Sequence, residues 1–229
     1  MNAPTDLARI VGVFAAVPLA NPDGRSGIAL HLDAGPARGA AYDLGGGNLV
    51  PFDVTLDPVA TEFAALKAKH FAPARAPIYR YMVWAHKQDG GITPGRTFAT
   101  PGDSFVVTLG GWTVGGSSDT KVATFVHELG HTFGLRHGGV DDVANKPNYL
   151  SIMNPAFETA GVPRTSGIPY FGYAFAVPPD LVESSLNEST GVASSALTSF
   201  RTKWSCPNGT IRATPATVNG PIDWNCNGT

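Results

Sequence analysis

Eleven residues decide the fold of this chain, His127-Glu128-Leu129-Gly130-His131-Thr132-Phe133-Gly134-Leu135-Arg136-His137. Residues four apart lie on one face of a helix, so His127 and His131 can direct two imidazoles at one metal ion. Glu128 lies about 100° around that helix from His127, where it can reach a water on the ion without binding the ion itself. Gly134 predicts the end of the helix, because glycine tolerates the positive φ of a sharp turn. His137 can then return as a third ligand. Three protein ligands leave one tetrahedral position for water, which favours a catalytic Zn²⁺ site over a structural one.

A second motif follows the histidines. The spacing H-E-x-x-H-x-x-G-x-x-H is far more specific than a lone H-E-x-x-H, and Met153 lies sixteen residues after His137 in Ser151-Ile152-Met153-Asn154-Pro155. Together the two motifs resemble those of the metzincin clan of zinc peptidases, in which a methionine lies beneath the metal site. Alone, Met153 would be a core residue. The resemblance makes it the methionine of a Met-turn.

The resemblance extends over about residues 117–155 and does not assign a subfamily. The residue after the third histidine separates metzincin families, and here it is Gly138. Glycine at this position fits none of the astacin, adamalysin, matrix-metalloproteinase or serralysin patterns. The block from His137 to Asn154 looks like a group of secreted bacterial metzincins.

Two further sets of residues are candidates for roles around the metal. Ligand histidines usually donate their other ring nitrogen to an acceptor, and the acidic residues near the third histidine are Asp141 and Asp142. An ordinary loop role is the alternative for both. Astacins and serralysins carry a tyrosine two residues after the Met-turn methionine, where this chain has Pro155. The replacement candidates for stabilising the oxyanion are Tyr149, Tyr170 and Tyr173, with ordinary packing as the alternative for each.

The resemblance implies an α+β fold in two parts. We expect an N-terminal catalytic subdomain over residues 1–134, with a mixed β-sheet and helices that include the zinc-binding helix. We expect a smaller, irregular C-terminal subdomain over residues 135–229, which carries the third ligand, the Met-turn and a disulfide. In metzincins the strand before the zinc helix pairs with an extended substrate, which here predicts pairing at residues 105–110. Trp112 would line the cleft or lie in the core.

Local patterns predict the individual elements. Helical spacing covers residues 58–70, and the zinc helix should run from a cap at Ser118 and Asp119 to about Phe133. A weaker helical pattern covers residues 180–186. The predicted strands are residues 8–17, 27–32, 78–86 and 104–109.

Composition limits the partners. The chain has 229 residues, of which 43% are hydrophobic and 15% charged, with a net charge of −2. That charge gives no electrostatic reason to expect nucleic acid or an anionic membrane as a partner. No apolar run approaches the ~20 residues that span a bilayer. We therefore expect a monomer that acts on a protein or peptide, without a nucleic-acid or membrane partner.

Both cysteines, Cys206 and Cys226, lie in the last 24 residues. One disulfide that closes a C-terminal loop is the favoured interpretation, because the Gly-, Pro- and Asn-rich tail has little core to hold it. A disulfide indicates an oxidising compartment, whereas two free thiols in a cytosolic protein are the alternative. We expect secretion, with any signal or pro-segment outside this sequence.

The last residues resemble half of a calcium loop. The run Asp223-Trp224-Asn225-Cys226-Asn227-Gly228 matches the start of an EF-hand-type loop, but no glutamate follows to complete it before Thr229. A partial Ca²⁺ site is one interpretation, and a disulfide-tethered turn is the favoured one.

These motifs predict a zinc-dependent endopeptidase in which Glu128 is the general base. Within enzymes, the alternative is a zinc peptidase restricted to one protein or one short peptide. Outside enzymes, the alternative is a catalytically silent zinc-binding module that recognises proteins or glycans. The mark of such a module is the loss of the glutamate or of a ligand, and this chain retains all four residues.

Overall fold

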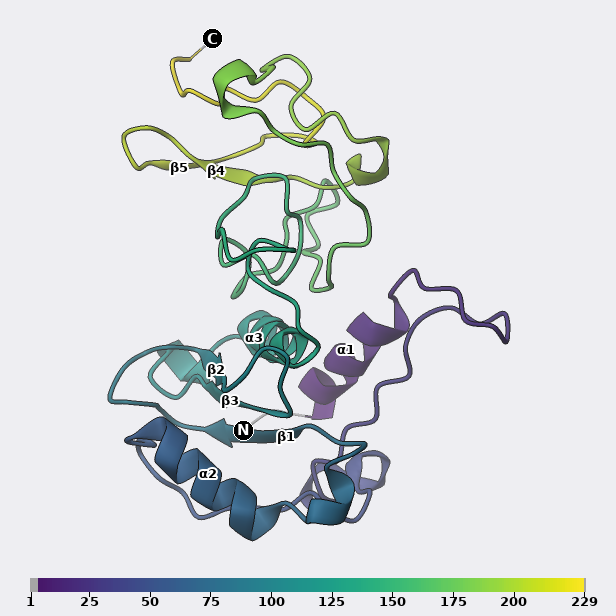
Figure 1. The fold of residues 1–229 in the computed structure, drawn as a ribbon, viewed down its shortest axis with the longest axis vertical. Coiled ribbons are helices and arrows are strands. Elements are labelled where there is room, and N and C mark those ends of the chain that lie inside the picture. Colours follow the sequence, from purple (N-terminus) through teal and green to yellow (C-terminus); the bar gives the residue numbers. More distant parts are fainter. Residues whose placement is uncertain (1–3, 229) are drawn as a thin grey trace. The chain divides into compact units, whose positions relative to one another are not determined.

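The computed structural model describes residues 4–228 and is of mixed helix and sheet (Figure 1), which confirms the predicted α+β class. The chain forms two compact units, each with more contacts within itself than to the other. The first unit ends at Leu135 and the second begins at Arg136. The regular elements are α1 (Pro4–Ala15), α2 (Val59–His70), β1 (Tyr81–Ala85), β2 (Gly95–Thr97), β3 (Ser104–Thr108), α3 (Ser118–Thr132), β4 (Lys203–Ser205) and β5 (Ile211–Ala213). Short 3-10 turns lie at Pro36–Arg38, Ala40–Tyr42, Pro73–Arg75, Thr113–Gly115, Glu183–Ser185 and Ser195–Leu197. Within residues 4–228, no helix is long and apolar enough to cross a membrane.

A three-stranded mixed sheet organises the first unit, with strand order β1-β3-β2. β3 pairs with β1 in parallel and with β2 antiparallel, and every residue of β3 is buried. The prediction that residues 105–110 pair with a substrate is therefore wrong for β3, because both edges of this strand are already occupied. The neighbouring strand β2 forms an edge of the sheet.

Helices cover both faces of this sheet (Figure 1). On one face, α2 contributes Val59 and Phe63 to a core that also contains Val83 and Val106. On the other face, Phe125 of α3 packs against aromatic rings of the sheet, edge-on to Phe105 at 5.3 Å and stacked with Trp84 at 6.1 Å. The zinc-motif helix is thus held by the sheet along its buried side.

Both ends of α3 have defined caps. The helix begins at Ser118, as predicted, but its cap is Ser117 rather than Ser118 or Asp119, because the Ser117 hydroxyl accepts a hydrogen bond from the Thr120 amide at 3.0 Å. Those two side chains bind α1 instead, Ser118 to Asp6 and Asp119 to Arg9. A cap one residue earlier leaves the first turn free to anchor the neighbouring helix.

The C-terminal end of α3 confirms the predicted stop at Gly134. The Leu135 amide donates to the Gly130 carbonyl at 3.1 Å, and the Gly134 amide donates to the His131 carbonyl at 2.9 Å. This pair of bonds is a Schellman motif, which requires a left-handed residue. Gly134 supplies it with φ of +89°.

The prediction of a strand over residues 8–17 is wrong. Most of this segment belongs to α1, which ends at Ala15. The run from Ile10 to Phe14 is rich in β-branched and apolar residues, which favours a strand by composition. The buried positions nevertheless follow helical spacing, at Leu7, Ile10 and Phe14, and this apolar side faces the protein interior. Residues 27–32 form no strand either.

A buried carboxylate organises the glycine-rich loop that follows. Asp33 accepts hydrogen bonds from the amides of Leu44 at 3.0 Å and Gly46 at 2.8 Å, and it forms an ion pair with Arg75. Burial alone would raise the pKa of Asp33, but the loop amides and the guanidinium outweigh it and leave the pKa lowered. A lowered pKa in the folded state means that the ionised carboxylate stabilises the fold above pH 4 and that this stabilisation is lost as the pH falls through the folded-state pKa.

We expect Asp33→Asn to lower the free energy of unfolding at pH 7 by about 1–3 kcal/mol, the usual contribution of hydrogen bonds to a charged group. The deficit in the free energy of unfolding should narrow as the pH falls below 4 and through the lowered folded-state pKa of Asp33, because the wild-type protein then loses the stabilisation by its ionised carboxylate. Urea unfolding at pH 7 and at pH 3 measures both values. The control is Asp43→Asn in the same loop, an exposed carboxylate with one longer bond of 3.3 Å to Gly45. An equal loss in both variants, or a deficit that does not change with pH, would contradict the assignment.

The second unit has little regular structure and a core of mixed aliphatic and aromatic side chains. The hairpin β4–β5 pairs Lys203–Ser205 with Ile211–Ala213, and the core beside it includes Phe157, Phe200 and Trp204. Residues 180–186 were predicted to be helical, but only the 3-10 turn at Glu183–Ser185 forms there. Cys206 and Cys226 form the predicted disulfide, which ties the C-terminal segment to the hairpin.

The terminal segment after Ile222 is a turn. The Asp223 carboxylate accepts the amides of Asn227 at 2.9 Å and Gly228 at 3.0 Å, and it pairs with Arg212 at 2.8 Å. Among residues 4–228, no group of His, Cys, Asp or Glu side chains close enough to hold an ion includes Asp223. The calcium interpretation receives no support.

Candidate metal centre

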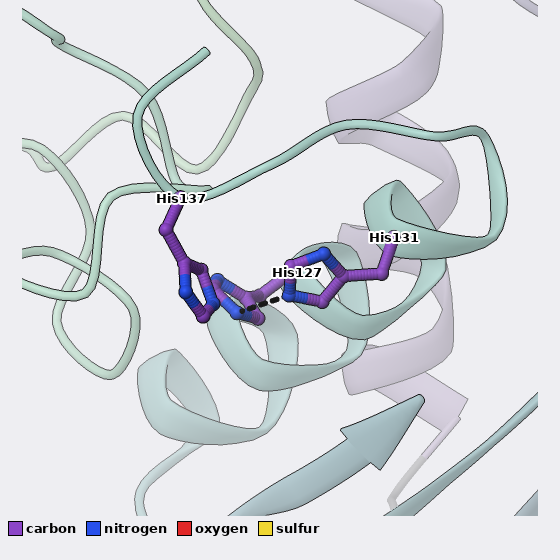
Figure 2. A group of neighbouring side chains, drawn as sticks. All are labelled: His127, His131 and His137. Carbon is purple, nitrogen blue, oxygen red and sulfur yellow. Dashed lines mark hydrogen bonds between the residues drawn. The ribbon is translucent and has the colours of Figure 1, made fainter. Parts of the chain in front are cut away.

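The three histidines of the motif converge, as Figure 2 shows. One ring nitrogen from each of His127, His131 and His137 lies within 4.8 Å of the others. The Nε2 atoms of His127 and His131 are 3.1 Å apart. Two ligands at zinc–nitrogen distances of 2.0–2.1 Å in a tetrahedral site would be separated by about 3.3 Å. The observed spacing therefore fits one zinc ion held by these nitrogens.

The protonation of the ligand rings also suits a metal. Nδ1 of His131 lies 2.8 Å from the Leu135 carbonyl oxygen. Because a carbonyl only accepts, Nδ1 carries the proton and Nε2 is left with its lone pair. Burial lowers the pKa of His137, and Asp142 opposes this effect. Neutral imidazoles are the form that binds metal.

The acceptor that orients His131 is therefore a backbone group. The sequence patterns made Asp141 and Asp142 candidate acceptors for the histidines of the motif, and that role stays a prediction. Asp141 binds Lys146 and the Val143 amide, and Asp142 pairs with Arg136 at 2.9 Å and acts electrostatically on His137. The Leu135 carbonyl is directed back at the helix by the turn at Gly134. In the sequence, only Gly134 indicates this contact, because the turn at Gly134 brings the Leu135 carbonyl close to His131.

Glu128 is buried, with 4% of its surface exposed. Thr97 of β2 donates its hydroxyl hydrogen toward this residue, with Oγ1 at 2.6 Å from Oε2 and at 2.9 Å from the backbone carbonyl oxygen. Gly95, two residues earlier on the same strand, lies against the carboxylate. Sequence reasoning did not find Thr97 or Gly95, because they lie about thirty residues before Glu128 and carry no motif.

Met153 lies in a tight turn, as the Met-turn interpretation requires. Its side chain is fully buried. The Asn154 amide donates to the Ser151 carbonyl at 3.1 Å, and the Met153 amide donates to the Ser151 hydroxyl at 3.2 Å. The Asn154 side chain then donates to the carbonyls of Lys146 and Tyr149, which fixes the turn against the preceding loop.

The three candidate tyrosines differ in their hydrogen bonds. Tyr170 donates to the Tyr173 carbonyl at 2.8 Å, so its hydrogen is committed within its own loop, and burial raises its pKa to about 12. Burial also raises the pKa of Tyr173 and of Tyr149. The Tyr149 hydroxyl donates to the Arg136 carbonyl over a long distance of 3.4 Å. Trp112, for which a cleft or a core position was predicted, is half-buried, and its Nε1 donates to the Ile92 carbonyl at 2.9 Å.

Fold and site together define the class. An α+β unit whose long helix presents two histidines four residues apart, followed by a glycine turn and a third histidine, has the metzincin-like arrangement of a zinc metallopeptidase. A family model described as Metallo-peptidase family M12B Reprolysin-like matches residues 74–138. The match spans 65 of the 229 residues, from just before β1 to just after the third histidine. No curated protein and no solved structure matches the chain.

The match confirms the resemblance to zinc metallopeptidases that the motifs predicted. It contains the sheet, the helix and all three histidines. Together with the three-histidine group, it supports zinc-dependent peptidase activity on protein or peptide substrates.

Proposed function

We propose that this protein is a zinc-dependent endopeptidase that hydrolyses internal peptide bonds of proteins, with Glu128 as the general base. The observation that carries the proposal is the convergence of three imidazole nitrogens within 4.8 Å, with a buried glutamate next to the first ligand in sequence. A zinc ion held by these nitrogens would supply an activated water and polarise the scissile carbonyl.

Glu128 would move the proton. Its carboxylate accepts a proton from the attacking water and returns it to the leaving amine. A buried carboxylate on a rigid helix suits this role, because the helix fixes it relative to His127 and His131.

Tyr149 is the tyrosine that we propose for stabilising the oxyanion. The Tyr149 ring lies against Gly139, two residues after His137. A Cβ atom added to Gly139 would be 3.5 Å from this ring. Its long bond to the Arg136 carbonyl can be exchanged for a substrate oxygen at little cost.

The substrate would bind along the edge strand β2. On either side of this strand, the Thr108 amide donates to the Pro94 carbonyl and the Phe98 amide donates to the Ser104 carbonyl, which joins both ends of β2 to β3. Backbone groups alternate in direction along an antiparallel strand, so the amides and carbonyls of Gly95 and Thr97 point away from β3. An extended peptide can pair with these groups by adding a strand to the sheet.

The remaining proposals concern the setting of the protein. The disulfide is compatible with an oxidising, extracellular environment, and we propose that the protein is secreted and acts as a monomer. We also propose that the part of the chain through the zinc helix is the catalytic subdomain and that the part after it completes the site with His137 and the Met-turn.

The proposal is tested by hydrolysis of denatured casein and of a mixed peptide library by the purified protein. We expect cleavage that stops after zinc is removed with a chelator and returns when Zn²⁺ is added back. Mass spectrometry of the products then tells endopeptidase cuts from terminal trimming. If the protein binds one zinc per chain and cuts neither substrate, the endopeptidase proposal fails and the silent zinc-binding module is favoured.

A further inference from the structure

Strand β2 touches Glu128 through two residues on the same face. Gly95 and Thr97 are two apart in the strand, so both face α3, while Arg96 between them faces the other way and pairs with Asp89 at 3.1 Å. The register with β3 supports this orientation toward α3. Thr97 lies opposite Phe105, and the Phe105 ring packs against Phe125 of α3.

The Thr97 hydroxyl has one hydrogen and two acceptors within reach on Glu128. The distance of 2.6 Å to Oε2 is that of a hydroxyl donating to an ionised carboxylate, and the distance of 2.9 Å to the carbonyl oxygen is longer. The hydrogen therefore goes to the carboxylate. The Thr97 hydroxyl lies beside both the backbone carbonyl and the carboxylate of Glu128. This contact favours one conformation of the Glu128 side chain.

Gly95 closes the other side of the same carboxylate. A Cβ at this position would lie 2.7 Å from Cγ and Oε1 of Glu128 and 3.0 Å from Cδ. Real Cβ atoms do not approach so closely, so any larger residue would displace the carboxylate. Gly95 has no positive φ, which means that the close approach, rather than the backbone conformation, requires a glycine here.

We propose that Thr97 is a positioning residue for Glu128, which holds the carboxylate by its hydroxyl in the space that Gly95 leaves open. The inference rests on the proposed role of Glu128 as general base. A glutamate has three rotatable side-chain bonds, and a misplacement of about 1 Å can cost 10²-fold in rate. A fixed carboxylate avoids that loss, so the contribution of Thr97 should lie in kcat rather than in substrate binding.

Two substitutions of Thr97 test whether its effect lies in kcat rather than in substrate binding. Thr97→Val keeps the shape and removes the hydroxyl, and we expect kcat to fall about 10- to 100-fold, as for a lost hydrogen bond to a charged group, with KM within about twofold. Thr97→Ser keeps the hydroxyl and should recover kcat to within about threefold of wild type. Zinc content and the thermal unfolding midpoint of each variant establish that the fold and the metal site are intact. A Val variant with wild-type kcat, or a Ser variant as impaired as Val, would overturn the proposal.

A second measurement does not depend on activity. In metal-free protein labelled with ¹³C at glutamate carboxyls, the Glu128 resonance is assigned by its loss in Glu128→Gln. We expect this resonance to keep its position in Thr97→Ser and to move in Thr97→Val. Gly95→Ala, which keeps the hydroxyl but fills the space, should also move it and lower kcat. If Thr97→Val is unstable, Gly95→Ala and Thr97→Ser still test whether the Glu128 carboxylate is held in this position. If wild type cuts no peptide, the proposed function fails, and the resonance shifts alone decide whether Thr97 holds the carboxylate.

Discussion

Glu128→Gln should lower kcat/KM for a cleaved peptide by about 10²- to 10⁴-fold, the usual contribution of a general base. Glutamine has the same shape and can still accept the hydrogen bond from Thr97, but its amide does not take a proton from water at neutral pH. The three histidines that we propose as zinc ligands are untouched, so zinc content should stay at one per chain. The two effects together separate proton transfer from metal binding.

Steady-state kinetics on a peptide from the library and atomic absorption for zinc make this measurement. The matched control is Glu183→Gln, which makes the same chemical change at an exposed glutamate in the second unit. We expect the control to keep wild-type kcat/KM. Near-normal hydrolysis by Glu128→Gln would remove Glu128 from the mechanism, and loss of zinc in that variant would assign it a structural role at the metal.

His137→Ala should weaken zinc binding by at least about 100-fold. Loss of a residue that merely supports a ligand costs 10- to 100-fold in affinity, and a lost ligand should cost no less. The two remaining ligands, His127 and His131, lie on one helix and leave the ion with an incomplete protein shell. Activity should therefore disappear at limiting zinc and return only in part at high zinc.

Competition with a chromophoric chelator gives the zinc affinity directly. Thermal unfolding gives a second value, because a ligand at 1,000 times its Kd stabilises the native state by about 4 kcal/mol, and His137→Ala should lose this stabilisation at the same zinc concentration. His31→Ala is the matched control, since His31 is an exposed histidine far from the motif. Unchanged zinc affinity in His137→Ala would exclude the third histidine as a ligand.

The zinc helix could be predicted from the sequence because its determinants are local. The positions of His127 and His131 follow from the helical period, and the stop at Gly134 follows from its tolerance of positive φ. The strands β1 and β3 were predicted for a similar reason, since their runs of apolar and β-branched residues are short and bounded.

The errors arose where tertiary packing decides the structure. The N-terminal run around Ile10 has the composition of a strand, yet it forms α1 because its buried side chains, with Asp6 and Arg9, fit α3. A partner more than a hundred residues away has no local signature. The prediction that residues 105–110 pair with a substrate failed for β3 for the same reason, because the antiparallel pairing of β2 with β3 is a property of the whole sheet.

The site beyond the motif could not be predicted either. The contact between Thr97 and Glu128 depends on which strand lies over the helix, and the acceptor for His131 is a backbone carbonyl, which any residue can supply. Asp141 and Asp142 were plausible from their position in the sequence. In the structure they form ion pairs with Lys146 and Arg136, which lie within a few residues of them, and their role around the histidines stays a prediction.

The three-residue length of β2 has a consequence for insertions and deletions. Side chains alternate between the faces of a strand, so a slip of one residue moves every side chain to the opposite face. A deletion in the connection between β2 and β3, residues 98–103, would bring Arg96 to face Glu128 and turn the outward-pointing backbone groups of Gly95 and Thr97 back into the sheet. The guanidinium would then pair with the carboxylate, and the edge that we propose for peptide binding would be lost in the same step. The length of this connection thus sets which face of β2 meets Glu128, although none of its residues belongs to the three-histidine group.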